Sequence, residues 1–309
     1  MDCARWPARP WQIWRFSDGK AGHDNQSLGL IAALAALRPI HPVTLPPLPW
    51  SAALRALWSR RWPESAALPA PDLLIGAGHG THLSLLAARR ACGGRTIVLM
   101  RPTLPLAWFD LGLVPEHDAL PSRPNVFITR GALNRIQPSS TLEPDRGLFL
   151  IGGPSSHFGW DSAALRGQIA AIVAADSTMH WTLTTSRRTP GNFLADWREV
   201  AGSRLTLVPV TQTDPDWLPA QLARSGQVWV SADSVSMIYE ALTAGAAVGV
   251  LGVPRQRPNR ISRGVDHLAA EGWVTPFADW RRELTLRRPP GIFNEAERCA
   301  RWIVEQWLV

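Results

Sequence analysis

Three polar loops in the C-terminal half of the chain carry residue types that bind phosphate and sugar groups. Each follows a short apolar run that predicts a strand, and in open parallel sheets ligands bind at the carboxyl ends of the strands. The first loop contains Gly152, Gly153, Ser155 and Ser156. Its glycines would let backbone amides approach a diphosphate, which the dipole of the following helix would favour. The alternative is a tight turn with a serine helix cap.

The second loop holds two adjacent arginines flanked by hydroxyl groups. It contains Ser186, Arg187, Arg188 and Thr189 and follows the strand predicted at 180–184. A guanidinium group matches the geometry of phosphate oxygens and can bind two of them at once. The loop therefore predicts a pyrophosphate clamp. The alternative is a solvated loop in which the arginines bind nothing.

The third loop leads into a predicted helix, whose first turn has unpaired backbone amides. Asp233, Ser234, Ser236 and Met237 surround this helix start. Glu240 lies four residues after Ser236 on the same helix face, where a carboxylate can accept both hydroxyl groups of a ribose. The alternative is an exposed helix glutamate. The three loops together predict a site for a nucleoside diphosphate.

One loop in the N-terminal half has the side chains for acid–base chemistry. It follows the first predicted strand and contains Asp18, Lys20 and His23. Histidine is the usual general base near neutral pH, so His23 or Asp18 is predicted to take a proton from a substrate hydroxyl. A structural loop histidine is the alternative. His79 and His82 are weaker candidates, and without a third ligand they make a poor metal site, so no metal is predicted.

Several known motifs are absent from the sequence. A Walker A loop needs a lysine followed by serine or threonine, and the single lysine precedes an alanine. The dinucleotide fingerprint fails at GAGHGT, where its last glycine would be Thr81. Short-chain epimerases and reductases use Tyr-x-x-x-Lys, but the single tyrosine, Tyr239, has Thr243 at that spacing. Asp214-Pro215-Asp216 has the metal-binding DxD form but does not directly follow a strand, so we interpret it as a turn.

Short apolar runs alternate with helical patterns along the chain, which indicates a parallel α/β architecture. The 309 residues suit two domains of roughly 150 residues each. We expect an N-terminal, acceptor-side Rossmann-like domain at 1–140 and a nucleotide-sugar-binding domain at 141–309. We leave open that the helix predicted at 294–307 packs back on the first domain. Further strands are predicted at 43–45, 72–75, 96–100, 109–114, 126–129, 148–151, 205–208, 228–230 and 247–251, and a helix at 192–200.

The charge of the chain favours anionic partners. The chain has 32 lysine and arginine residues against 25 acidic ones, which gives a net charge of +7. Lys20 is the single lysine, so nearly all the basic residues are arginines. A phosphorylated substrate or an anionic membrane surface fits this charge. Nucleic acid is not predicted, because the arginines are scattered and their densest run, at 281–288, lacks interleaved aromatic residues and glycines.

Sixteen tryptophans against one tyrosine is an unusual composition. Most of them are expected in the core. The alternative for two groups is an interfacial patch that docks on lipid, since aromatic and basic residues together favour a membrane surface. The first group is Trp6, Trp11 and Trp14, and the second is Trp50, Trp58 and Trp62 beside Arg55, Arg60 and Arg61.

Cysteine usage and hydropathy predict a cytoplasmic protein. The three cysteines, Cys3, Cys92 and Cys299, lie far apart without a CxxC pair, which favours a reducing compartment. No segment offers the about 20 uninterrupted apolar residues of a membrane span. The N-terminus lacks the apolar region of a signal peptide. We expect a cytoplasmic protein that can lie at the inner face of the membrane.

Six motifs, in order, resemble the bacterial relatives of the plant mitochondrial fission protein ELM1, also described as a glycosyltransferase family of the ELM1/GtrOC type. The resemblance extends from about Trp14 to Phe277, and departs at Gly245-Ala246-Ala247, where the family commonly has a proline. The motifs are WRFSDGKAGHDNQSLGL, PEHD, TRGALN, IGGPSSHFGWD, TSRRTP and SADSVSMIYEALTAG.

The resemblance implies a GT-B-like fold, with two Rossmann-like domains and a cleft between them. It also implies that a nucleotide sugar is held mainly by the C-terminal domain, without an obligatory metal or other cofactor. The GGPSS, TSRRTP and DSVSMIYE motifs would then face the donor, and the loop with His23 would face the acceptor.

Two functions follow from these features. The first is a glycosyltransferase that moves a sugar from a nucleoside diphosphate to a lipid or surface-polysaccharide acceptor. The second keeps the fold but acts as a non-catalytic, membrane-associated adaptor, as the plant members of the family imply. Nucleotide binding would favour the first, and lipid binding without nucleotide binding would favour the second.

Overall fold

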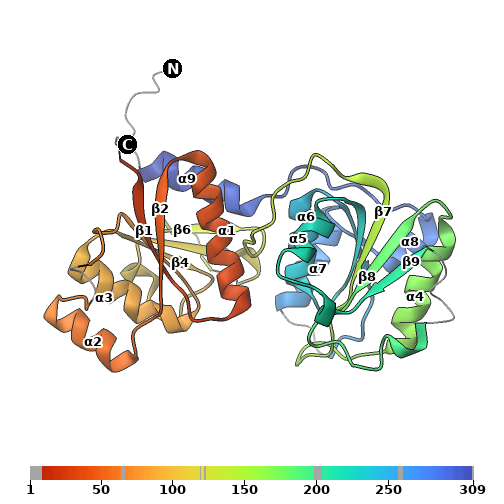
Figure 1. The fold of residues 1–309 in the computed structure, drawn as a ribbon, viewed down its shortest axis with the longest axis horizontal. Coiled ribbons are helices and arrows are strands. Elements are labelled where there is room, and N and C mark those ends of the chain that lie inside the picture. The colour runs from red at the N-terminus through yellow and green to blue at the C-terminus, as the bar shows by residue number, and fades with distance from the viewer. Residues whose placement is uncertain are drawn as a thin grey trace, which may run out of the picture. The chain divides into compact units, whose positions relative to one another are not determined.

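A computed structural model describes residues 9–63, 67–118, 120–121, 123–197, 204–256 and 260–307. The chain divides into two compact units. Unit 1 comprises Met1–Arg135 and Glu295–Val309, and unit 2 comprises Ile136–Asn294. Within the described residues each unit is built on a six-stranded sheet whose neighbouring strands are parallel (Figure 1). The predicted α/β class with two parallel sheets is confirmed.

The sheet of unit 1 has the strand order β2-β1-β3-β4-β5-β6. Its strands are β1 (Trp11–Phe16), β2 (Ile40–Leu45), β3 (Leu73–Ala77), β4 (Arg95–Leu99), β5 (Leu111–Pro115) and β6 (Val126–Thr129). The helices of this unit are α1 (Ala21–Leu37), α2 (Trp50–Ser59), α3 (His82–Cys92) and α9 (Glu295–Trp307). The inner strands β3, β4 and β5 are short, largely apolar and almost fully buried, as expected for strands covered on both faces, whereas the edge strand β2 is mostly exposed or half-buried.

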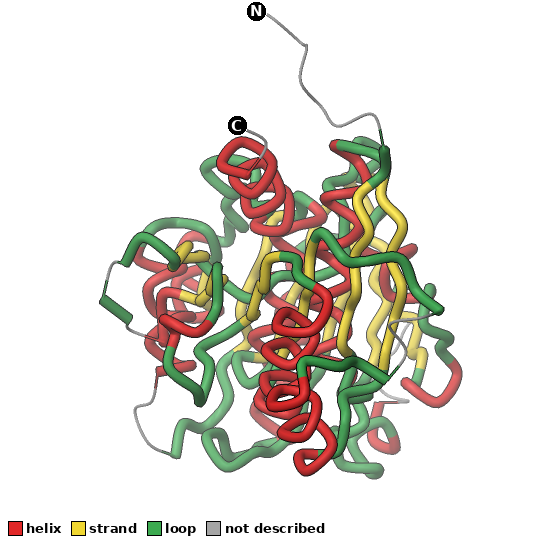
Figure 2. Tube along the Cα trace, turned by 90° about the vertical axis from the view of Figure 1, so that its left-hand side faces the viewer, coloured by secondary structure: helices red, strands yellow, loops and turns green. Residues whose placement is uncertain are grey.

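Alternate residues of each strand in unit 1 enter two separate cores, because successive side chains of a strand point to opposite faces of the sheet. On β1, Trp11 and Ile13 pack with α1 and α9, whereas Trp14 and Phe16 pack with α2 and α3. Figure 2 looks at this unit and shows the helices lying along the strands. The last helix of the chain therefore completes a core that begins at its first strand.

The sheet of unit 2 has the strand order β12-β11-β10-β7-β8-β9. Its strands are β7 (Glu143–Leu150), β8 (His180–Thr184), β9 (Leu205–Val208), β10 (Ser225–Ser231), β11 (Ala247–Leu251) and β12 (Thr275–Pro276). The helices are α4 (Ser162–Ala175), α5 (Trp217–Leu222), α6 (Val235–Ala244), α7 (Arg260–Ala270) and α8 (Phe277–Glu283). Leu148, Phe149 and Leu150 at the centre of the sheet have no exposed surface.

Both sheets reverse their direction of growth beside their first strand. In unit 1 the chain goes from β1 to β2 on one side and then to β3 on the other. In unit 2 it goes from β7 to β8 and β9 on one side and then to β10 on the other. Loops leave such a point in opposite directions, which opens a place for a ligand at the carboxyl ends of the strands.

The predicted and observed elements differ most in the second half of unit 2. Only a 3-10 turn, Ala195–Trp197, occupies the described part of the helix predicted at 192–200; residues 198–203 lie outside the described residues. The helices α7 and α8 were not predicted. α8 has only seven residues and ends in Arg281, Arg282 and Glu283, so its apolar pattern is too brief to stand out in the sequence.

Candidate functional site

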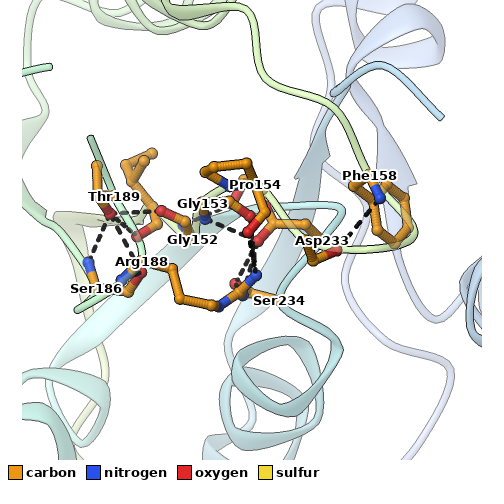
Figure 3. A network of polar contacts seen from close by, with 12 residues as sticks. Gly152, Gly153, Pro154, Phe158, Ser186, Arg188, Thr189, Asp233 and Ser234 are labelled. Carbon is orange, nitrogen blue, oxygen red and sulfur yellow. Dashed lines mark hydrogen bonds and ion pairs between the residues drawn. The ribbon is translucent and has the colours of Figure 1, made fainter. Parts of the chain in front are cut away.

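The three polar loops of unit 2 lie side by side because the strands before them are neighbours in the sheet. The loop with Gly152 follows β7, the loop with Arg188 follows β8, and the loop with Asp233 follows β10. In the sheet, β7 lies between β10 and β8. Figure 3 shows the side chains of the three loops converging in one polar network. The sequence-predicted residues of this half are therefore brought together around the reversal point.

Arg188 joins the three loops. Its Nη1 donates to the carbonyl oxygen of Gly153 at 2.8 Å, and its Nη2 donates to Asp233 Oδ2 at 2.8 Å and to Ser234 Oγ at 3.2 Å (Figure 3). The Asp233 side chain is fully buried, whereas that of Arg188 is 43% exposed. A buried carboxylate needs such a partner, because an unpaired buried charge is strongly destabilising. Arg188 thus fixes the shape of the site.

The two oxygens of Asp233 have different surroundings. Oδ2 accepts hydrogen bonds from the amide of Gly153 at 2.9 Å, from Arg188, and from the hydroxyl of Ser234 at 3.1 Å. Oδ1 is buried and has no hydrogen-bond partner among the described residues. A buried acceptor without a donor costs about 1–3 kcal/mol. A water molecule or a ligand hydroxyl bound there would relieve that penalty.

The glycines of the first loop serve packing within the protein. The amide of Gly152 donates to Ser231 Oγ at 2.8 Å and that of Gly153 donates to Asp233, so both expected phosphate donors already have acceptors. A Cβ atom at Gly153 would lie 2.1 Å from the carbonyl oxygen of Arg188. The structure therefore explains both glycines by the close approach of the loops around them.

The hydroxyl residues of the first two loops shape their own backbone. Thr189 Oγ1 lies 3.0 Å from the carbonyl oxygen of Ile151 and accepts from the amide of Ser186 at 2.8 Å. Ser186 Oγ accepts from the amide of Arg188, and Ser155 Oγ accepts from the amides of His157 and Phe158. These contacts position the arginine loop against β7.

The groups that can receive a ligand lie on the outer side of this network. Arg187 is exposed and forms no ion pair within the described residues. Ser156 and Ser236 are also exposed, and Met237 is half-buried. Ser234 begins α6 without a side-chain bond to the amides of the first turn, which leaves the positive end of the helix dipole open to an anion.

Glu240 lies on the second turn of α6. It is half-buried and already takes part in an interaction within the protein. A ribose at this position would have to share the carboxylate with that partner.

A largely apolar pocket of about 400 Å³ lies at the carboxyl ends of β10, β11 and β12. Its lining includes Ala232, directly before Asp233, together with Val250, Val253 and Phe277. Its polar lining residues are Gln168 and the ion pair of Arg255 with Asp266. A cavity of this size and composition suits a flat, mostly apolar ring. Sequence reasoning missed it because α7 and α8, which form one wall, were not predicted.

In unit 1 the predicted acid and base form a hydrogen-bonded pair. His23 Nδ1 lies 2.9 Å from Asp18 Oδ2 and 3.0 Å from Oδ1. The side chain of Asp18 is 10% exposed and that of His23 is 21% exposed. A proton on Nδ1 donated to the carboxylate leaves the lone pair of Nε2 to accept another proton, which is the arrangement of a general base held by an acid.

The electrostatic environment of Asp18 keeps it ionised. Burial of the carboxyl group favours its neutral form, but the hydrogen bonds from His23 and from the Lys20 amide, and the charges of both residues, outweigh burial and lower the pKa of Asp18. The ammonium group of Lys20 lies 3.6 Å from Oδ2. An ionised Asp18 holds the imidazole in one orientation and stabilises it when it gains a proton.

The loop after β3 packs directly on this pair. Gly78 has a φ of +82°, and a Cβ atom there would lie 2.2 Å from Cε1 of His23. Gly80 is near Asp18 but would tolerate a Cβ atom, whose nearest neighbour would be 3.7 Å away. No pattern in the sequence indicates this contact, which joins the loop after β3 to the first turn of α1.

The two weaker histidine candidates occupy different environments. His82 is buried, and burial, with a smaller effect from the charge of His79, lowers its pKa to about 4. Its ring packs edge-on against Phe109. His79 lies exposed in the 3-10 turn before it. His82 is therefore part of the core under the loop.

Two further searches of the described residues bear on metals and membranes. Those residues contain no group of three or more His, Cys, Asp or Glu side chains placed to hold a metal ion. In the same part of the chain, no helix combines the length and apolar character that crossing a bilayer requires.

Comparison with known proteins identifies a family and a fold. Residues 21–307 match the model of the family described as mitochondrial fission ELM1, as the sequence motifs predicted. No curated protein sequence matches the chain.

Solved structures resemble the chain over nearly its whole length. A UDP-N-acetylglucosamine 2-epimerase has a TM-score of 0.61 at 15% identity, covering 97% of this chain and 95% of that one. The UDP-GlcNAc 2-epimerase of Methanocaldococcus jannaschii has a TM-score of 0.58 at 10% identity, covering 96% and 100%. The calicheamicin glycosyltransferase CalG4 has a TM-score of 0.50 at 13% identity, covering 96% and 95%. The fold is therefore GT-B-like, as predicted.

Proposed function

Since the chain belongs to the mitochondrial fission ELM1 family and has a GT-B-like fold, we propose that it is a glycosyltransferase. It transfers a sugar from a nucleoside diphosphate donor to a hydroxyl group of a lipid or a surface polysaccharide. One observation carries the proposal: anion-binding groups gather at the reversal point of one sheet, and a His–Asp pair lies at the reversal point of the other. Fold alone would not support an activity.

The donor diphosphate binds in unit 2 between Arg187 and the first turn of α6. Arg187 supplies a guanidinium group without an ion pair in the described residues, and the α6 amides supply donors at the positive end of a helix. Arg188 holds the loop in place through Asp233. These groups neutralise the charge that grows on the diphosphate as it leaves, which is the charge that must be stabilised in the transition state.

The nucleoside part occupies the neighbouring surface. The base enters the pocket that begins at Ala232, and Glu240 on α6 accepts the ribose hydroxyl groups. The structures that resemble this chain include enzymes named for UDP-N-acetylglucosamine, which supports a UDP-type donor.

The acceptor hydroxyl gives its proton to His23. The acceptor oxygen forms a bond to the anomeric carbon, the bond from that carbon to the diphosphate oxygen breaks, and the nucleoside diphosphate leaves with the electron pair. The proton passes to Nε2 of His23, whose Nδ1 is held by Asp18. A general base of this kind contributes about 100- to 10,000-fold to the rate.

Calorimetry with UDP, GDP and CMP tests the donor site. We expect the wild-type protein to bind at least one of these nucleotides. Arg187→Ala should weaken that binding about tenfold, because a hydrogen bond to a charged group contributes about 1.5–3 kcal/mol, reduced here by exposure. Glu240→Ala should also weaken it. Arg281→Ala removes an exposed arginine of α8 in the same unit and should change nothing.

The result that sinks the proposal is a folded wild-type protein that binds none of the three nucleotides. We also propose that the reaction needs no metal ion. The transfer rate measured with a metal chelator should then equal the rate measured without it.

A membrane-bound adaptor without transferase activity is the second candidate. One observation favours it: two tryptophans of α2, Trp50 and Trp58, are largely exposed. Lipid binding by a protein that binds no nucleotide would support the adaptor over the transferase.

A further inference from the structure

The outer face of α2 carries a row of large apolar side chains in contact with solvent. Trp50 is 71% exposed, Leu54 is 43% exposed and Trp58 is 91% exposed. Scattered single apolar residues are common on protein surfaces, but contiguous apolar patches mark interaction sites. Of the exposed large apolar residues in the described part of the chain, this is the set that shares one element.

Helix geometry makes these three residues one continuous ridge. They are spaced four apart along α2, so each side chain lies above the previous one on the same face. Ala53 and Ala56, on another face of the helix, are buried, and Ala56 belongs to the core formed with α3 and the sheet. The core of unit 1 therefore does not require the ridge.

The charged residues from Trp50 to Trp62 are all positive. Between Trp50 and Trp62 the sequence has Arg55, Arg60 and Arg61 and no acidic residue. All three arginines are exposed, and none forms an ion pair with another described residue. Arg55 lies on α2 beside the ridge, and Arg60 and Arg61 follow its last turn.

We infer that this surface, made of Trp50, Leu54, Trp58, Arg55, Arg60 and Arg61, docks unit 1 on an anionic lipid bilayer. Tryptophan prefers the boundary between lipid headgroups and acyl chains, where its ring is apolar and its N–H group can still bond to water. The arginines contact headgroup phosphates. The helix lies on the surface, since it has only 10 residues. The inference does not depend on the proposed transferase activity.

The occupant that competes with a bilayer is a second copy of the chain. A self-contact through this face would bring the arginines of two copies together, which opposes it by like-charge repulsion. An anionic bilayer instead complements both the apolar ridge and its positive border. The charge therefore favours the membrane.

Vesicle flotation of the full chain without nucleotide tests the inference. Wild-type protein is mixed with vesicles of phosphatidylcholine alone or of phosphatidylcholine with phosphatidylglycerol. We expect flotation with the anionic vesicles, weaker at high salt because screening reduces the attraction of the arginines. The double variant Trp50→Ser/Trp58→Ser should lower the fraction bound about tenfold, and Arg55→Gln/Arg61→Gln should lower it less.

Ile292→Ser is the matched control. Ile292 is 82% exposed in unit 2, away from α2 in the sequence, and its replacement removes a comparable exposed apolar side chain. We expect it to float like wild type. Far-ultraviolet circular dichroism and the unfolding midpoint should be unchanged in every variant, since no altered side chain is buried.

Three results would overturn the inference. The wild-type protein could fail to float with anionic vesicles. The tryptophan double variant could float as well as wild type. Sedimentation could also show a wild-type dimer that Trp50→Ser/Trp58→Ser converts to a monomer, with no flotation, which would assign the face to a second copy. Because no nucleotide is present, each result is distinct from a failure of donor binding.

Discussion

The reversal points of the two sheets occupy the same place in their units but hold opposite chemistry. In unit 1 a carboxylate orients an imidazole, and we propose that this pair moves a proton. In unit 2 a buried carboxylate orients an arginine, and a second arginine beside it has no ion pair in the described residues. Parallel topology provides the location in both, and the residue types after each strand decide what the location does.

The comparison also shows two ways of holding a functional side chain. His23 is held by one partner and by the close approach of Gly78. Arg188 is held by contacts from three loops. Substitutions in the pair of unit 1 should therefore lower mainly the activity. Substitutions in the network of unit 2 should lower mainly the free energy of unfolding.

The largest effect is expected at His23. In His23→Asn the acceptor hydroxyl loses the base that takes its proton, so the transfer rate should fall about 100- to 10,000-fold. Nucleotide binding by unit 2 should stay within about twofold of wild type, because His23 belongs to unit 1. Rates are measured with saturating donor, and binding by calorimetry. Equal losses of rate and of binding would mean that the two sites do not divide the work as proposed.

As the pH falls, the folded state of unit 1 should lose stability before that of unit 2. His82 is buried and its pKa falls from 6.5 to about 4 on folding, so the folded state binds fewer protons than the unfolded state in that range. Its contribution to stability is complete above pH 6.5 and is lost as pH falls toward about 4. The loss is roughly 3 kcal/mol, at about 1.4 kcal/mol per pKa unit. The described histidines of unit 2, His157, His180 and His267, are exposed, whereas His82 is buried.

Hydrogen exchange resolved by peptide measures this difference. Between those two pH values, protection in α3 should decrease more than protection in α4, after correction for the intrinsic rate. His82→Gln should remove the difference. A wild-type protein that loses protection equally in both helices would contradict the assignment to His82.

The two neighbouring arginines separate stability from binding. Arg188→Ala removes the cation beside the buried Asp233 and should lower the free energy of unfolding of unit 2 by about 2 kcal/mol. Arg187→Ala should change it by less than about 0.5 kcal/mol, because Arg187 is exposed. Urea unfolding of both variants gives the comparison. If Arg187→Ala proved the more destabilising change, the roles would have to be exchanged.

The smallest effect is expected from the glycines beside His23. In Gly78→Ala the new methyl group would meet the imidazole, and the transfer rate should fall about tenfold as the ring is displaced. Gly80→Ala is the control, since its Cβ atom would make only an ordinary contact with Asp18. Both variants are compared by rate and by unfolding midpoint. A rate loss in Gly80→Ala as large as in Gly78→Ala would argue against displacement of the ring.

The sequence predicted strands well wherever a short apolar run was bounded by polar residues. The runs at 126–129, 180–184, 205–208 and 247–251 were predicted with the observed bounds. β7 begins five residues before the predicted start because Glu143 to Arg146 are polar and pair at the end of the sheet. Hydropathy cannot detect a strand whose hydrogen bonds extend beyond its apolar part.

The candidate site was predictable as a set of loops and unpredictable as a set of contacts. Asp18 and His23 were predicted in one loop as alternative bases, and the structure instead places His23 in the first turn of α1, where it pairs with Asp18. The contact of Gly153 with Asp233 joins residues 80 positions apart, and nothing in the sequence indicates that the Gly153 amide faces the protein.

The burial of the tryptophans was also not predictable from the sequence alone. Trp11, Trp14 and Trp62 are buried, so the interfacial interpretation is wrong for them, and Trp6 lies outside the described residues.

The position of α9 makes unit 2 an insertion within unit 1. Ala296, Cys299 and Ile303 of this helix belong to the same core as Ile13 and Leu30. A stop codon that removes the last turns of the protein would therefore damage the half that carries His23, at the opposite end of the gene. Residues 136–294 form one continuous stretch, whereas unit 1 consists of two segments that a shortened chain would have to join by a new linker.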